Sequence, residues 1–104
     1  MSKLNEEERA SALAQLAGWE LHPQRDAILR SFRFRDFAEA FAFMTQVALA
    51  AEKADHHPEW SNVWNRVDVL LTTHSDGGLT QKDVALARRI DRIAASLAGS
   101  ARSD

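Results

Sequence analysis

Residues 52–83 read EKADHHPEWSNVWNRVDVLLTTHSDGGLTQKD and carry three of the four histidines of the chain. The pair His56 and His57 precedes Pro58, and the residue before a proline avoids the helical region, so a helix arriving from the N-terminal side must end here. His74 follows a run of alternating residues that predicts a strand. Because a folded chain could bring these three histidines together, we interpret this stretch as the active site.

Two strands are predicted between the histidine pair and His74. Residues 60–64 and 67–74 have the composition of strands, and a tight turn near Asn65 and Arg66 joins them. His74 would then end the second strand. The face of this strand that we expect to be buried holds Val67, Val69 and Leu71.

A helix is predicted on either side of this stretch. The earlier helix begins at Asp36, which together with Glu39 resembles a capping box, and the later helix is capped by Thr80 with Asp83. Each helix carries apolar residues at helical spacing, which predicts one buried stripe. The earlier stripe holds Phe37, Ala40, Phe41, Met44, Val47, Ala48 and Ala51, and the later one Leu86, Ile90, Ile93 and Leu97.

The N-terminal third is predicted to add a helix and two strands. Asn5 and Glu8 resemble a capping box, so a helix should run to about Ala17, where Gly18 can take the left-handed conformation that ends it. The buried edge of this helix should hold Leu13, Leu16 and Ala17. Beyond it we expect an extended segment from Trp19, a turn over residues 22–26, and a strand over residues 27–35 that buries Ile28, Phe32 and Phe34.

The chain is expected to form one α+β domain over residues 1–104. That length allows one core, and a hydrophobic content of 45% indicates a packed interior. The predicted order is helix, strand, strand, helix, strand, strand, helix, which favours a four-stranded antiparallel sheet with helices packed on one face. Residues 99–104 should form a frayed tail.

Charge and composition argue against several classes of protein. Thirteen basic and fifteen acidic residues give a net charge of −2 without a basic tract, so direct nucleic-acid binding is not expected. The absence of cysteine excludes disulfides, thiolate catalysis and cysteine-ligated zinc. The N-terminal MSKLNEEERA has no apolar core of a signal peptide, and no apolar run approaches the roughly 18 residues of a spanning helix. A cytoplasmic location without membrane contact is the expectation.

The histidines suit proton transfer. Imidazole has the side-chain pKa closest to neutrality, so two or three rings on one pocket wall fit acid–base catalysis. Zinc held by three histidines with a water in the fourth position is an alternative. It is the less favoured one, because adjacent His56 and His57 would point apart in regular backbone and no HExxH pattern is present.

Each of these residues also has an ordinary structural interpretation. A histidine at a helix end, such as His56, is more often a partner of the helix dipole than a catalyst. His22 lies in a turn, and Asp83 caps a helix whatever else it does. Trp60 and Trp64 are by composition core or interface residues, although an aromatic ring beside polar groups also suits a flat heterocycle.

The residues of the central stretch form a spaced pattern. Glu52 is followed after three residues by His56, His57 and Pro58, and Trp64, His74 and Asp83 come after further gaps of five, nine and eight residues. This pattern resembles the signature of pterin-4a-carbinolamine dehydratases, and the similarity includes EKADHHPEW, NVWN, TTH and GLTQKD. The order of elements fits from about residue 19 to residue 97. The departures are minor, such as Trp64 where tyrosine is also common.

The resemblance implies a lyase that dehydrates 4a-hydroxytetrahydrobiopterin to quinonoid dihydropterin in tetrahydrobiopterin recycling. It implies a small-molecule pterin substrate and no metal or organic cofactor. By motif position the active-site histidines are His56, His57 and His74, and the candidate pocket or supporting residues are Glu52, Asp55, Trp60, Thr72, Thr73 and Asp83. The chemistry needs one proton delivered to the leaving hydroxyl and another taken from the ring, and each such transfer is worth roughly 10²–10⁴-fold.

A binding class stays open beside the enzyme. Relatives of this family act as dimerisation partners of a homeodomain transcription factor, and degenerate members assist an assembly process. An open sheet edge is usually paired or covered, so we expect a homodimer joined edge to edge, and the resemblance adds a homotetramer formed through a helix. Phe43, which lies off the stripe of its helix, is the predicted contact in that tetramer.

Overall fold

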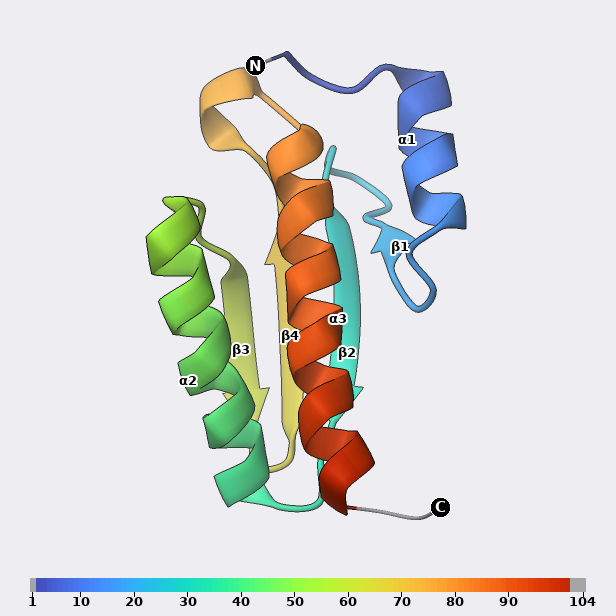
Figure 1. Ribbon diagram of the computed structural model, residues 1–104. Coiled ribbons are helices and arrows are strands. Elements are labelled where there is room, and N and C mark those ends of the chain that lie inside the picture. Colours follow the sequence, from blue (N-terminus) through green and yellow to red (C-terminus); the bar gives the residue numbers. More distant parts are fainter. Residues whose placement is uncertain (1, 102–104) are drawn as a thin grey trace.

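The computed structural model describes residues 2–101, with side chains as far as Leu97. In that range the chain forms helices α1 (Glu6–Ala14), α2 (Phe37–Ala54) and α3 (Gln81–Ala101), strands β1 (Glu20–Leu21), β2 (Ile28–Arg33), β3 (Glu59–Val63) and β4 (Arg66–Leu71), and the 3-10 helix η1 (His74–Asp76). Figure 1 shows α2 and α3 lying across one face of the sheet, with α1 beside β1. No helix within this range is long and apolar enough to cross a bilayer.

The strands form an antiparallel sheet in the order β1-β2-β4-β3. In its central pair, Ile28 lies opposite Leu71 and Phe32 lies opposite Val67, so the apolar residues of both strands share the face beneath the helices. Strand β3 is at an edge. The predicted fold class, the antiparallel sheet and the order of elements are confirmed.

The predicted helix starts are also confirmed. Asn5 and Glu8 form a reciprocal capping box on α1. The side chain of Asp36 accepts a hydrogen bond from the backbone N–H of Glu39 at 2.9 Å. At α3 the backbone N–H of Thr80 donates to Asp83 Oδ2 at 2.9 Å. Local sequence therefore fixes where each long helix begins, because each cap satisfies a backbone donor that the helix itself leaves unpaired.

The buried side of α2 differs from the predicted stripe. Phe43 has no exposed surface, and its ring centroid lies 4.9 Å from that of Phe32 and 4.8 Å from that of Phe34. Phe37 and Phe41, predicted to be buried, are 49% and 56% exposed. The prediction that Phe43 contacts another subunit is therefore wrong. Helix α2 has apolar side chains around much of its circumference, so spacing alone does not identify the face that packs on the sheet.

The N-terminal helix is shorter than predicted. Helix α1 ends at Ala14, and Ala17, expected to be buried, is exposed, whereas Leu16 is buried as expected. Gly18 adopts the left-handed conformation with φ of 90°. A Cβ at this position would lie 2.8 Å from the guanidinium of Arg30, so both the backbone angle and the close contact require glycine.

The segment after β4 also differs from the prediction. Strand β4 ends at Leu71, so His74 does not end the strand but begins η1. Thr73 pairs with Gly78 in an isolated antiparallel bridge, which closes the loop that carries η1. Helix α3 continues to Ala101, so the predicted tail is wrong over residues 99–101, and residues 102–104 lie outside the described part.

Candidate active site

The end of α2 fixes the position of His56. The backbone N–H of His56 donates to the carbonyl of Ala51 at 3.1 Å, and that of Asp55 donates to the carbonyl of Glu52 at 3.2 Å. These are the two hydrogen bonds of a Schellman motif. Asp55 supplies the left-handed residue that the motif needs, with φ of 54° and ψ of 43°. The motif ends the helix and turns His56 inward, where it is 9% exposed.

A buried hydrogen-bond network holds the ring of His56. Its Nε2 lies 2.6 Å from Asp83 Oδ1. The other carboxylate oxygen, Oδ2, accepts from Thr73 Oγ1 at 2.7 Å and from the backbone N–H of Thr80 at 2.9 Å. Asp83 and Thr80 have no exposed surface, and Thr73 is 5% exposed. Asp83 therefore caps α3 and orients His56 with the same carboxylate.

This network determines which ring nitrogen of His56 faces outward. An ionised carboxylate only accepts hydrogen bonds, so Nε2 of His56 carries the hydrogen donated to Asp83. Nδ1 of the same ring has no hydrogen-bond partner among the described residues. A carboxylate that fixes one tautomer leaves the opposite nitrogen free to accept a proton. The arrangement equips His56 as a proton acceptor.

His74 is held in a different way, at the surface. Its Nε2 lies 2.9 Å from Glu59 Oε2, and its side chain is 75% exposed. Arg25 binds the carboxylate of Glu59 with two nitrogens, at 3.0 and 2.9 Å. The hydrogen bond from Arg25, and after it the one from His74, lowers the pKa of the Glu59 carboxyl to about 2, although desolvation opposes this. Glu59 is therefore ionised at neutral pH and can accept a hydrogen bond from His74.

The turn before β2 brings Arg25 to this site. His22 Nδ1 accepts hydrogen bonds from the backbone N–H groups of Gln24 and Arg25, both at 3.1 Å. His22 therefore organises the turn, in agreement with its structural interpretation. Arg25 and Glu59 were not among the predicted site residues. Glu59 lies within the HHPEW motif, which is a signal that could have identified it, whereas the contact of Arg25 depends on tertiary structure.

His57 follows His56 directly in the sequence and lies at the surface. Its Nε2 is 2.8 Å from Glu52 Oε1, and the two side chains are 56% and 80% exposed. An exposed pair of this kind contributes little to stability. His57 is thus free to move toward a ligand, and Glu52 is placed to hold it.

The other predicted site residues differ in their burial and in their hydrogen-bond partners. Thr72 Oγ1 donates to the carbonyl of Asp26 at 2.8 Å, so its hydroxyl hydrogen is used within the fold. Trp60 is half-buried and packs against the core from β3. The side chain of Asp55 is exposed and has no partner among the described residues. Thr80, which the sequence indicated only as a cap, also hydrogen-bonds Thr73, with 2.9 Å between their hydroxyl oxygens.

The histidines do not form a metal site in the described part of the chain. No group of three histidine or carboxylate side chains there is placed to hold a metal ion. The zinc interpretation therefore has no ligand set among these residues.

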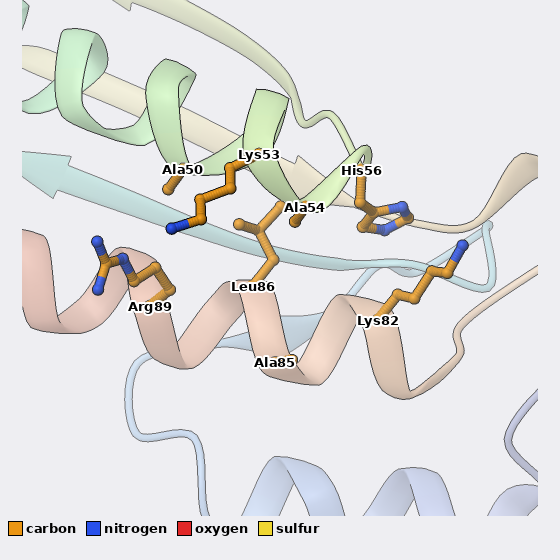
Figure 2. A pocket seen from close by; sticks show the side chains of 8 residues that line it. All are labelled: Ala50, Lys53, Ala54, His56, Lys82, Ala85, Leu86 and Arg89. Carbon is orange, nitrogen blue, oxygen red and sulfur yellow. The ribbon is translucent and has the colours of Figure 1, made fainter.

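His56 also lines a groove between α2 and α3, shown in Figure 2. The volume of this groove is about 360 Å³, within the range of small-molecule sites. An α+β domain with a buried histidine–carboxylate pair, two exposed histidines and an adjacent groove has the parts of an acid–base site for a small molecule.

Comparison with known proteins assigns the family. The family described as pterin 4 alpha carbinolamine dehydratase matches residues 2–93. A relative from Rhizorhabdus wittichii, provisionally named a pterin-4-alpha-carbinolamine dehydratase, is 65% identical over 91 residues, which are 88% of this chain and 94% of the relative. A Bradyrhizobium protein with the same provisional name is 59% identical over 98 residues, 94% and 99% of the two chains. The chain therefore belongs to the pterin 4 alpha carbinolamine dehydratase family.

Solved structures agree with this assignment. The crystal structure of a transcriptional coactivator/pterin dehydratase from Brucella melitensis is 54% identical, with a TM-score of 0.88 over 89% of this chain and 99% of that one. A pterin dehydratase-like protein identified as a RuBisCO assembly factor in the α-carboxysome is 23% identical, with a TM-score of 0.66 over 74% and 89% of the two chains. The second likeness shows a shared fold.

Proposed function

We propose that this protein dehydrates 4a-hydroxytetrahydrobiopterin to quinonoid dihydropterin and water, and so serves tetrahydrobiopterin recycling. The observation that supports this most directly is the buried contact of His56 with Asp83 in a chain of the dehydratase family. Burial of such a polar pair is costly unless every group is hydrogen-bonded.

Two histidines divide the proton transfers in this proposal. The imidazolium form of His74, hydrogen-bonded to the ionised Glu59, delivers a proton to the 4a hydroxyl, and the bond from C4a to that oxygen breaks as water leaves. His56 Nδ1 assists by accepting the proton lost from the adjacent ring nitrogen, which forms the new double bond to C4a. His57 chiefly binds substrate. His74 is the main catalyst in this proposal because it is exposed to a ligand and its ring is oriented by Glu59.

Substrate contacts in this proposal come from the end of α2 more than from the threonines. The hydroxyl hydrogens of Thr72 and Thr73 are used within the protein, so these residues support the site. The carboxylate of Asp55 is exposed and has no partner among the described residues, so it can accept hydrogen bonds from the amino group of a pterin. Trp60 supports the β3 side of the site.

The decisive test follows the reaction directly. An aromatic amino-acid hydroxylase generates the 4a-hydroxy compound, and absorbance records its decay with and without this protein. We expect acceleration that disappears in a folded variant with His56, His57 and His74 all changed to alanine. A folded wild-type protein that binds pterin and gives no acceleration would refute the enzyme and favour a binding module.

A binding role is the second candidate, and one surface favours it. Phe37, Phe41 and Leu49 on α2 are all about half or more exposed, and the rings of Phe37 and Phe41 lie 5.8 Å apart. An apolar surface of this kind marks a protein contact.

We propose that this surface of α2 holds a homotetramer together, in place of Phe43, while the free edge of β3 pairs two copies into a homodimer. Light scattering tests this: a monomer mass refutes both contacts, and Phe41→Glu should reduce a tetramer to a dimer.

A further inference from the structure

The groove between α2 and α3 combines positive charge with an apolar floor. Lys53 of α2 and Lys82 and Arg89 of α3 supply the charge. Between them lie short apolar side chains and one leucine, namely Ala50, Ala54, Ala85 and Leu86. Among the residues that line the groove there is no acidic side chain.

These three cations differ from the five arginines that form ion pairs, and Lys3, Arg33, Arg88 and Arg92 likewise have no ion pair among the described residues. Arg25, for example, pairs with a carboxylate, as do Arg9, Arg30, Arg35 and Arg66. Lys53, Lys82 and Arg89 have no carboxylate partner among the described residues. The chain as a whole has a net charge of −2, so this local excess is a property of the groove. A concave surface lined by one sign of charge concentrates ions of the other sign.

The cations stand at both ends of the groove. Lys82 and Arg89 are two helical turns apart, which places their backbones about 10 Å from each other along α3. Figure 2 shows Lys82 near His56 at one end and Lys53 near Arg89 at the other, with Leu86 between. A ligand that lies along the groove thus meets His56, then an apolar floor, then two cations.

We propose that this groove binds an anionic pterin side chain, so that 4a-hydroxypterins with a carboxylate or phosphate on the side chain are preferred over 4a-hydroxytetrahydrobiopterin, whose side chain is neutral. This rests on the proposed function, because His56 belongs both to the groove and to the proton-transfer network. A pterin with a neutral side chain leaves the three cations without a counter-charge. The polar ring sits at the His56 end, and the anion lies toward Lys53 and Arg89.

Binding of two oxidised pterins that cannot react tests the proposal. One carries a neutral dihydroxypropyl side chain and the other a side chain with a carboxylate, and their fluorescence gives Kd for each. We expect the carboxylated pterin to bind about tenfold more tightly at low salt, with a preference that shrinks as salt rises. In the double variant Lys53→Gln with Arg89→Gln, which removes both cations at the anion end, the preference should fall to about twofold or less. Arg88→Gln, which removes the same charge from the side of α3 that contacts Gln15, should keep it.

Two results would overturn the proposal. Equal affinity for both pterins in the wild-type protein is one, and a preference that survives the double variant is the other. If neither pterin binds, the direct reaction assay decides the proposed function, and inorganic phosphate decides whether the groove holds anions. Amide shifts over residues 50–54 and 82–89 that vanish in the double variant would uphold anion binding, and unchanged amide spectra would overturn it.

Discussion

The buried site around His56 and the surface site around His74 pair a histidine with a carboxylate in opposite ways. Asp83 has no exposed surface and makes hydrogen bonds through both oxygens to groups inside the protein. Glu59 is 44% exposed and is held by Arg25 from the solvent side. The first pair is part of the core, and the second could be removed without opening a cavity.

Because of this difference in burial, the His56 site should mainly affect stability and the His74 site should mainly affect catalysis. In the core, a polar group that loses its partner keeps its desolvation cost, so His56, Thr73 and Asp83 are coupled to the stability of the fold. At the surface, water and salt screen the charges, so His74 can gain and lose a proton without disturbing the structure. The buried site gives a fixed tautomer, and the surface site gives a proton that exchanges readily.

The largest expected effect is on the buried site. Asp83→Ala removes the partner of His56, Thr73 and the backbone of Thr80 together, so we expect a loss of about 3 kcal/mol in the free energy of unfolding measured with urea. Asp36→Ala is the matched control, because it removes a cap of α2 that binds a single backbone N–H, and it should cost about 1 kcal/mol. Equal losses in both variants would mean that the buried network adds nothing beyond the cap.

At the surface site we expect a large effect on catalysis and a small effect on stability. We expect His74→Ala to lower kcat by about 100-fold or more while the free energy of unfolding changes by less than about 0.5 kcal/mol. His57→Ala is the matched control, because it removes a second exposed histidine, and it should raise KM more than it lowers kcat. A His74 variant that folds normally and keeps the kcat of the wild-type protein would rule out His74 as the main acid.

Local signals in the sequence predict much of the fold but only part of this contrast. The capping residues Asn5, Asp36 and Asp83 act on backbone groups within three residues, so short-range chemistry decides them. The capping signal does not reveal that Asp83 also orients His56, because this contact joins positions 27 residues apart. In the sequence, an aspartate that only caps a helix cannot be distinguished from one that also orients a histidine of the candidate site.

The errors on α2 and after β4 have physical reasons of the same kind. Phe37, Phe41 and Phe43 lie on two overlapping apolar stripes of one helix, and the choice between them depends on the rings of β2. The strand pattern of residues 67–74 predicts that His74 ends the strand, but β4 ends at Leu71 and Thr73 pairs with Gly78 instead. Tertiary packing decides both cases.

The pH dependence of stability tests the contribution of Glu59, the carboxylate of the surface site. The pKa of Glu59 is lowered in the folded state from the ordinary 4.5 to about 2, first through the hydrogen bond from Arg25. A lowered pKa stabilises the fold above about pH 4.5, and this contribution is lost as pH falls toward 2. The Tm of wild type should therefore exceed that of Glu59→Gln by about 2 °C at pH 6, because the pair is largely exposed, and the difference should vanish near pH 2. A difference that stays constant over this range would contradict the assignment.

The smallest expected effect on stability is at Asp55, directly before His56. Asp55→Gly relieves a left-handed backbone but adds entropy to the unfolded chain, and since each effect is about 1 kcal/mol, the free energy of unfolding should change by less than about 0.5 kcal/mol. Asp55→Ala keeps the left-handed strain and loses the polar side chain that eases it, so it should cost about 1 kcal/mol. Both variants lack the carboxylate and should raise KM for the pterin by the same factor. A rise in KM that follows stability, present in the alanine variant and absent in the glycine variant, would show that Asp55 serves only to end the helix.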